Sequence, residues 1–353
     1  MCKSLIPLLA AVALPTAVNA DTGFSNEVNL KNKDIKTEWQ IQGQTQGAGV
    51  PNSSGIGSFI PFAIKEKSLW FLDSKLNANF GDFDGSSIIN TDVAGTSFST
   101  STRIGYRSLN KDNSKMYGFN FGYDTRNMNT GNADNASVSH KKDVSFQQVA
   151  FNFEAVSENL NINSYALIPT GDVEKHLNDT YRGGAVNTYG MDVGFDLTDN
   201  LTSSIGYYYQ YRNQEKVDGS GVKGNISCQL SDDLNVGVNV SYDYAYDTRL
   251  SGNFKYTFGD KSKKSNSKII NAITASPSNR DVRVHDCDSY KSTNSAGQVE
   301  TTCISGSNPY GIVDSKGRCI CDATALECGC YPGRGKPYTR YCWKGSCYLE
   351  PDS

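Results

Sequence analysis

The sequence has no long hydrophobic run after its first twenty residues. A transmembrane helix needs a stretch of about 18 or more apolar residues, so none is predicted there. Histidine is scarce (3 residues), and no serine stands in a nucleophile motif. Asp and Glu (37) nearly balance Lys and Arg (34), which argues against a partner nucleic acid. We therefore expect no enzyme, no nucleic-acid binding, no cofactor and no metal.

The N-terminus predicts export. A short apolar stretch, Leu5 to Leu14, follows the positive Lys3, and small residues precede Asp21. This pattern is typical of a secretory signal peptide over residues 1–20, and it is too short for a membrane anchor.

Polar and apolar residues alternate from Leu69 to Phe258, the period of β-strands. The alternating segments are 70–80, 98–107, 117–123, 149–155, 160–168, 189–197, 203–211, 222–230, 234–242 and 248–258. Residues 55–64 or 37–43 are candidates for further strands. The pattern predicts an all-β chain: a transmembrane antiparallel up-and-down β-barrel of about 10–12 strands, followed by a small disulfide-rich module.

Alternation alone also fits a soluble β-sandwich. The spacing of aromatic residues favours a membrane barrel, because Trp70 and Phe80 are separated by roughly 25 Å along the normal of a tilted strand, the height of an outer-membrane apolar band. The other side of the strands is small or charged, as a solvated lumen allows. We expect these charged residues to face the lumen: Asp73, Lys75, Arg103, Arg107, Glu154, Asp192 and Asp196.

The connections between strands alternate in length. Long ones are expected at 81–97, 124–144 and 169–187, and tight ones near 109–114, 156–159, 198–200 and 231–233. Outer-membrane barrels have long external loops and short periplasmic turns, so the first strand is expected to run outward and the last to return to the periplasm at Phe258. The last strand ends in Phe254, Tyr256 and Phe258, similar to the terminal signal read by the barrel assembly machinery.

Two stretches resemble the opening hairpins of the inverse autotransporter (intimin/invasin-like) β-barrel domain. They contain Ile104-Gly105-Tyr106-Arg107 and Gly118-Phe119-Asn120-Phe121-Gly122-Tyr123-Asp124, and Arg103 stands where that family has a glycine. The chain also resembles uncharacterised outer-membrane proteins of marine cyanobacteria. The first resemblance implies that the segment after the last strand returns through the lumen and carries a passenger outside.

The segment after the barrel is a basic, polar linker. Its lysines 261, 263, 264 and 268 are candidates to pair with Asp73, Glu154, Asp192 and Asp196 in the lumen. A solvated periplasmic linker is the alternative. The expected organisation is a signal peptide (1–20), a periplasmic N-terminal segment (21–54), the barrel (55–258), the linker (259–280) and a cysteine-rich module (281–353).

The last segment holds eight cysteines: Cys287, Cys303, Cys319, Cys321, Cys328, Cys330, Cys342 and Cys347. In an exported segment with few bulky apolar residues, this content predicts a disulfide framework of undetermined connectivity. A metal site at the two Cys-x-Cys pairs is the alternative interpretation, but that spacing is not a zinc-binding pattern. Cys228 is expected to face lipid as a small hydrophobe.

Two functional classes follow from these expectations. The first is an outer-membrane anchor that displays the cysteine-rich module at the cell surface for adhesion or interaction with an unknown surface ligand. The second is a small channel or structural barrel with a periplasmic appendage. In both, the expected location is the outer membrane of a Gram-negative-type bacterium (a cyanobacterium is one candidate), and the expected partners are outer-membrane lipids and the barrel assembly machinery.

Overall fold

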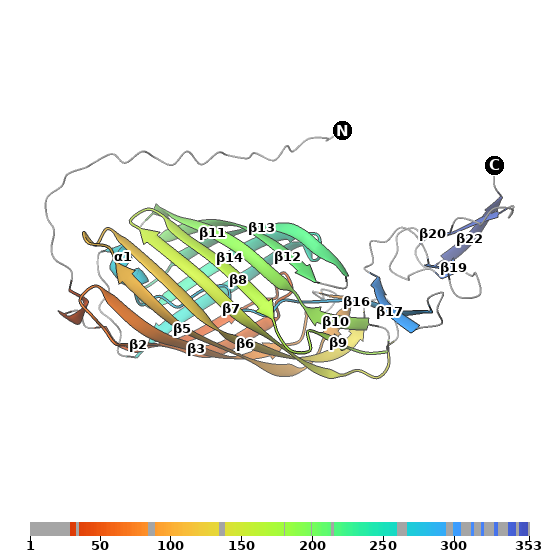
Figure 1. Ribbon diagram of the computed structural model, residues 1–353, viewed down its shortest axis with the longest axis horizontal. Helices are drawn as coiled ribbons and strands as arrows, with labels where there is room; N and C mark the ends of the chain where they lie inside the picture. Colours follow the sequence, from red (N-terminus) through yellow and green to blue (C-terminus); the bar gives the residue numbers. More distant parts are fainter. Residues whose placement is uncertain are drawn as a thin grey trace, which may run out of the picture.

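The computed structural model describes residues 29–32, 35–83, 89–133, 138–179, 181–198, 200–212, 215–259, 267–293 and 299–304, with short strands beyond them up to residue 351. Its main sheet has 13 strands, of which the short β4 (Thr91–Val93) pairs only with β6 at an edge. The remaining twelve pair antiparallel with their neighbours, and β15 closes the ring by pairing with β1, for example Trp39 with Phe258. The predicted antiparallel barrel is confirmed (Figure 1).

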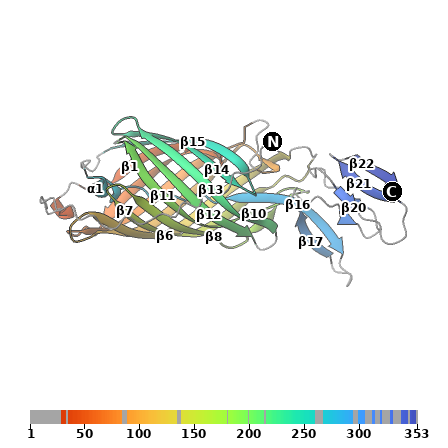
Figure 2. The same ribbon diagram turned by 90° about the horizontal axis from the view of Figure 1, so that it is seen from above.

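The barrel strands follow one another in sequence order. They are β1 (Glu38–Gln44), β2 (Asn52–Phe62), β3 (Ser68–Phe80), β5 (Thr96–Leu109), β6 (Lys115–Ala133), β7 (Asp143–Ser157), β8 (Asn161–Pro169), β11 (Asn187–Thr198), β12 (Leu201–Arg212), β13 (Glu215–Gln229), β14 (Leu234–Asp243) and β15 (Asp247–Phe258). In Figure 2 these strands cross the long axis obliquely, as strands of a closed barrel must.

The predicted start of the barrel at residue 55 is wrong. Both candidate strands before the Trp70 segment exist, and β1 at Glu38–Gln44 pairs with β2 and β15 at once. This strand is short, and the side chains on its inward side are glutamines, Gln40, Gln42 and Gln44. Three amides in seven residues resemble a polar linker, and closure of the ring gives their backbone partners on both sides.

The two faces of the strands differ in polarity as the alternation predicts. Large apolar side chains are exposed on the outside, including Ile205, Val238 and Leu250, at 64%, 53% and 70%. The inward side buries polar residues such as Asp73, Arg103 and Asn152. An exposed apolar band around a polar interior is the arrangement of a barrel with lipid outside and a polar lumen.

Among the described residues, no helix is both long and apolar enough to cross a membrane.

The two ends of the barrel are here called the loop end, which has the longest connections together with the short ones at 213–214 and 244–246, and the turn end. The connections around 81–95 and 170–186 lie at the loop end and contain β4, β9 (Glu174–His176) and β10 (Tyr181–Ala185). The turn end has the tight connections 110–114, 158–160, 199–200 and 230–233. The predicted long connection 124–144 is wrong, because β6 and β7 extend past the expected rim and leave only residues 134–142 between them.

The chain turns back into the barrel after β15. Helix α1 (Lys268–Ala272) lies at the turn end, and β16 (Val284–Thr293) lies at the loop end, paired with β10 (Figures 1 and 2). Residues 273–286 therefore join one end of the barrel to the other, and we call them the threaded segment. Strand β16 also pairs with β17 (Val299–Ile304). The remaining strands are β18 (Ile312–Val313), β19 (Cys319–Ile320), β20 (Cys328–Cys330), β21 (Tyr338–Trp343) and β22 (Ser346–Pro351).

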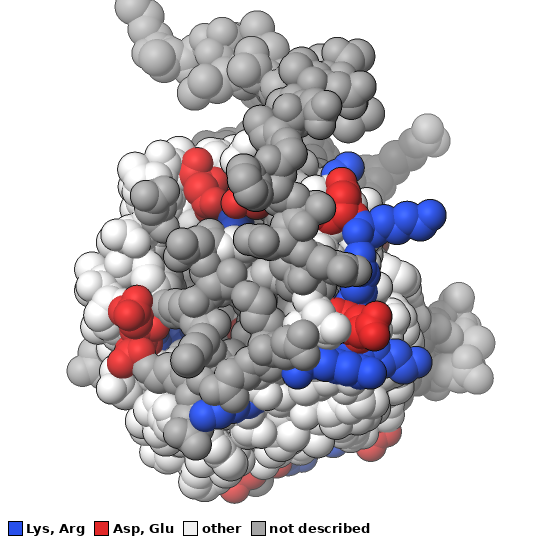
Figure 3. Space-filling model, turned by 90° about the vertical axis from the view of Figure 1, so that its left-hand side faces the viewer, with Lys and Arg blue, Asp and Glu red and all other residues white. Residues whose placement is uncertain are grey.

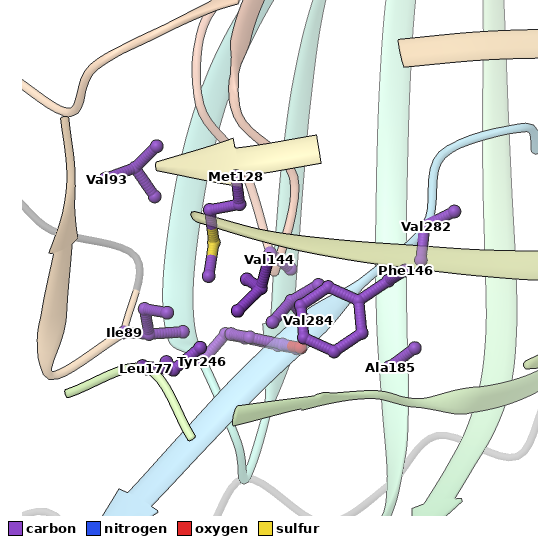
Figure 4. Packing of buried hydrophobic residues seen from close by; sticks show 11 residues of the cluster. Ile89, Val93, Met128, Val144, Phe146, Leu177, Ala185, Tyr246, Val282 and Val284 are labelled. Atoms are coloured by element: carbon purple, nitrogen blue, oxygen red, sulfur yellow. The ribbon is translucent and has the colours of Figure 1, made fainter. Parts of the chain in front are cut away.

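Each end of the lumen is closed by an apolar cluster. At the turn end, Ile269, Ile270 and Ile273 of the returning chain pack with barrel residues and with Leu30 of the 3-10 helix η1 (Leu30–Asn32). Phe71 of this cluster lies over Gly105, where a Cβ would come within 2.3 Å of the ring, so the inward glycine makes room for it. At the loop end, Val282 and Val284 pack among residues from the barrel and its loops, such as Phe146 and Tyr246 (Figure 4).

Candidate functional site: a segment held inside the barrel

The threaded segment is held by side chains from strands all around the barrel. Ser276 accepts a hydrogen bond from Gln40 Nε2 on β1 (2.9 Å), and Ser278 accepts one from Asn163 Nδ2 on β8 (2.6 Å). Asn279 accepts from Lys223 Nζ on β13 (2.8 Å). Contacts from opposite sides of the ring show that the segment runs inside the lumen.

Three barrel arginines bind the main chain of the segment. Arg107 Nη1 donates to the carbonyl oxygens of Ile273 (3.0 Å) and Ala275 (2.6 Å) near the turn end. Arg126 donates to Val282 O (2.9 Å) and Arg212 to His285 O (2.8 Å) near the loop end. Residues 273–283 have no strand partner for their carbonyls, and these guanidinium groups satisfy several carbonyls of the threaded segment.

The threaded segment contributes one buried ion pair of its own. Arg280 pairs with Asp73 on β3, and both side chains are almost fully buried (5% and 0% exposed). Arg280 Nη2 also donates to the carbonyl oxygens of Asp73 and Ser101 (both 3.1 Å), and Nε to Ser101 Oγ (2.6 Å). This pair fixes the segment against β3 and β5 at mid-length.

The lumen wall carries its own charge pairs. Arg103 and Asp124 form a bidentate pair at 2.6 and 2.7 Å, and Gln148 donates to the same carboxylate at 2.8 Å. Arg107 pairs with Glu154 at 2.8 Å while its guanidinium stacks 4.6 Å from the centre of the Phe71 ring. Because Asp124 and Glu154 each have an arginine donor, these charges of the lumen wall are not isolated.

The charged residues predicted for the lumen lie on the inward side of the strands. Four of them form the ion pairs described above: Asp73, Arg103, Arg107 and Glu154. A fifth, Asp192, pairs with Lys223 at 3.0 Å. Lys75 lines a cavity beside the threaded segment. Asp196 lies toward the turn end and pairs with Lys268 at 2.5 Å.

The partners predicted for these carboxylates are mostly different from the observed ones. Of the four linker lysines, Lys268 forms the expected pair, and residues 261, 263 and 264 lie outside the described part of the chain. Asp73, Glu154 and Asp192 pair with arginines or with a lysine of the barrel. Lys268 begins α1 at the turn end, whereas these three carboxylates lie deeper along the strands.

Sequence reasoning missed four arginines that line or cross the lumen: Arg126, Arg212, Arg280 and Arg283. Strand alternation could have found the first two, because Arg126 shares the inward parity of Asp124 and Arg212 that of Tyr208. The guanidinium of Arg283 lies 4.4 Å from the centre of the Tyr208 ring. Its place in the lumen could not be predicted, because no sequence pattern indicates that residues 273–286 are buried.

At the loop end, two titratable groups of β16 are buried. The carboxylate of Asp286 accepts hydrogen bonds from the backbone N–H of Asn90 (2.9 Å) and Thr91 (2.8 Å) and from Asn90 Nδ2 (3.1 Å). Burial nevertheless raises the pKa of Asp286 to about 6. Burial and the nearby Arg212 lower the pKa of His285 to about 4, so the ring is neutral and hydrogen-bonds the carbonyl of Ala245 through Nε2 (3.1 Å).

The remaining predicted site residues lie elsewhere. Phe254, Tyr256 and Phe258 alternate on the exposed side of β15, opposite β1. Cys228 is a free, partly exposed thiol on β13. The side chains of the eight C-terminal cysteines lie outside the described part, although the backbone register sets Cys342 opposite both Cys328 and Cys347. No group of metal-ligating side chains occurs among the described residues.

Where the described atoms are visible, the surface of the turn end carries both acidic and basic side chains, with no patch of a single charge sign. Viewed along the barrel axis, acidic and basic side chains are interspersed around the rim (Figure 3). The barrel therefore presents a mixed surface at this end, while its strongest charge pairing lies inside.

A closed antiparallel barrel with an apolar exterior and a polar, filled lumen is the architecture of outer-membrane β-barrel proteins. No family model matches the sequence, and no curated protein does. Solved structures do match. A protein from a study of in-meso crystallization of membrane proteins covers 71% of this chain and 98% of its own, at 12% identity and a TM-score of 0.51. The likeness shows the fold alone.

Two further solved structures have lower TM-scores. The COG4313 outer membrane channel from Pseudomonas putida F1 is 11% identical and covers 67% of this chain and all of its own (100%), with a TM-score of 0.43. The KdgM porin is 10% identical and covers 63% of this chain and 99% of its own, with a TM-score of 0.36.

Proposed function

We propose that this protein is an outer-membrane anchor that presents its C-terminal segment on the cell surface, in the manner of an inverse autotransporter. The observation that carries the proposal is the threaded segment, which enters at the turn end beside α1 and leaves at the loop end as β16. In outer-membrane barrels the long loops face outward. With that orientation, everything after residue 286 would lie outside the cell.

The contacts of the threaded segment support a permanent role in the folded protein. Its anchors are spread over β1, β3, β5, β6, β8 and β13, and both apolar clusters include its residues. A segment trapped by chance would not supply apolar side chains at both mouths and a matched ion pair between them. We propose that the barrel and the segment form one anchoring unit.

The proposed partners follow from the same arrangement. Outer-membrane lipids would contact the exposed apolar band, and the barrel assembly machinery would read the terminal strand with Phe254, Tyr256 and Phe258. A surface ligand would bind the C-terminal segment, whose eight cysteines we propose to be oxidised to disulfides. Mass spectrometry of the unreduced segment tests that: a mass about eight protons below the reduced form is expected, and stoichiometric metal with free thiols would refute it.

Epitope tags on intact cells test the display proposal. A tag placed after Ser353 should be labelled without permeabilisation, whereas a tag between Asp21 and Lys31 should be labelled only after the outer membrane is opened. If the C-terminal tag also requires permeabilisation, display is wrong, and the barrel has the opposite orientation or a periplasmic appendage.

A channel is the second candidate function. Two cavities of about 320 and 510 Å³ flank the threaded segment inside the lumen; the wall of the smaller is mostly polar and that of the larger is mixed. Such spaces would pass water or small ions if they joined from end to end. Conductance in planar bilayers decides: for a display anchor, the full chain should conduct far less than a chain ending at Gly259, whose lumen lacks the segment. Equal conductance would favour the channel.

A further inference from the structure

One of the two lumenal cavities is lined by hydrogen-bond donors that have no acceptor. The cavity measures about 320 Å³ and lies between residues 276–282 of the threaded segment and the strands β1, β2, β3, β5, β6, β14 and β15. Amide and hydroxyl groups form much of its wall, among them those of Gln42, Asn77 and Ser99.

Positive charge exceeds negative charge around this cavity. Lys75, Arg126, Lys255 and Arg280 line it, with Asp281 as the one lining carboxylate among the described residues. Arg280 is neutralised by Asp73, which lies behind the wall. The ammonium group of Lys75 has neither a hydrogen bond nor an ion pair with any described residue. A positive charge confined in a protein interior is costly unless a counter-charge or water accompanies it.

The unpaired groups of the wall are all donors. Asn79 is 3% exposed, and its Oδ1 accepts from Ser99 Oγ (3.1 Å), which fixes the amide so that Nδ2 has no acceptor. Gln44 Nε2 is buried without an acceptor as well. Arg126 is 2% exposed, and while its Nη1 binds the carbonyls of Gly49 and Val282, its Nε and Nη2 remain unpaired.

We propose that this cavity binds a small oxyanion of the phosphate or sulfate type. The two unpaired cations, Lys75 and Arg126, supply charge-assisted hydrogen bonds, and the amides of Asn79 and Gln44 supply neutral ones. The volume admits such an ion together with several waters. Binding would tie β1, β3 and β6 to the threaded segment. The site is independent of which way the barrel faces, so it stands whether or not the C-terminal segment is displayed.

Calorimetric titration of the full chain in detergent with inorganic phosphate and with sulfate tests the proposal. One ion per barrel is expected, with affinity that falls as chloride is raised. Lys75→Met should weaken binding by roughly tenfold to a hundredfold, the effect of losing one hydrogen bond to a charged group. Lys75→Arg should retain binding, and Lys115→Met, at the exposed start of β6, should leave it unchanged.

Asn79→Asp provides a second test that keeps the side chain's shape. It retains the acceptor for Ser99 and adds a negative charge to the wall, so it should abolish anion binding in a barrel that still shows heat-modifiable gel mobility. No heat of binding with the natural chain, or equal binding by the natural chain, Lys75→Met and Asn79→Asp, would overturn the proposal and leave a water-filled cavity.

Discussion

At the residue scale, arginine side chains hold the threaded segment inside the lumen. Arg107, Arg126 and Arg212 bind main-chain carbonyls of the threaded segment, so they recognise an extended chain whatever its side chains. Only Arg280, on the segment itself, requires a specific partner, Asp73. The planar, always-charged guanidinium suits both tasks, because it offers several donors in fixed directions.

Breaking the specific pair should therefore be costly. Arg280→Met leaves the fully buried carboxylate of Asp73 without its cation, and we expect the free energy of unfolding in detergent to fall by about 3 kcal/mol. Lys268→Met, which removes a partly exposed pair with Asp196, should cost less than about 1 kcal/mol. Similar losses for both variants in urea titrations would mean that the Arg280 pair is solvated in the folded barrel.

The exit of the segment should respond to pH through two opposed groups. The pKa of His285 falls from 6.5 to about 4 in the folded state, so its contribution is present above pH 6.5 and is lost as the pH drops toward 4. The pKa of Asp286 rises from 3.8 to about 6, so its contribution is present below pH 3.8 and is lost as the pH rises through 6. Between pH 4 and 6.5 the two largely cancel.

Asp286→Asn removes the titration of Asp286 and leaves that of His285. Amide hydrogen exchange of β16 should then accelerate as the pH falls from 6.5 to 4, after correction for the intrinsic pH dependence of exchange, while the natural chain changes little. His285→Gln is the matched control and should show the opposite slope, since only Asp286 titrates there. Parallel pH profiles for all three proteins would contradict the burial of these groups.

At the element scale, strand alternation predicted most of the barrel. All ten segments from Trp70 to Phe258 correspond to strands, because their outward residues are apolar and their inward residues polar over many positions. The predicted barrel did not include β1, because the inward side chains of this strand are glutamines. The loop-end parts of β6 and β7 were not predicted, because pairs such as Asn127 with Ser145 lie beyond the apolar band. There the outward residues need not be apolar, so the alternation is lost.

One pair of substitutions on β14 tests the two faces. Val238 is 53% exposed on the outside, and the next residue, Asn239, points inward and accepts a hydrogen bond from Asn225 Nδ2 (2.8 Å). Arginine facing lipid at mid-bilayer costs roughly 2–4 kcal/mol, so Val238→Arg should reduce the heat-modifiable, assembled form in membranes. Asn239→Arg should assemble normally. Equal yields would contradict the assignment of one face to lipid and the other to the lumen, and a defect in Asn239→Arg alone would mean that the faces are reversed.

At the scale of the whole molecule, the sequence left the route of the linker open between the lumen and the periplasm. Periodicity could not decide, because residues 273–283 belong to no strand or helix and their apolar residues, such as Ile273 and Val282, lie far apart in the chain. Each belongs to a different apolar cluster at a different end of the barrel. The donor-lined cavity could not be predicted either, because its wall combines residues of seven strands with a segment that has no periodic pattern.

The central claim, that the chain after the last strand lies inside the barrel, is tested most directly by proximity in intact cells. Asn163 and Ser278 are hydrogen-bonded at 2.6 Å across the lumen, so the pair Asn163→Cys and Ser278→Cys, in a background where Cys228 is serine, should be joined by a short thiol crosslinker within one chain. The control pair Ile162→Cys and Ser278→Cys, with position 162 on the lipid side, should remain unlinked. A link in the control alone, or in neither pair, would contradict the threaded segment.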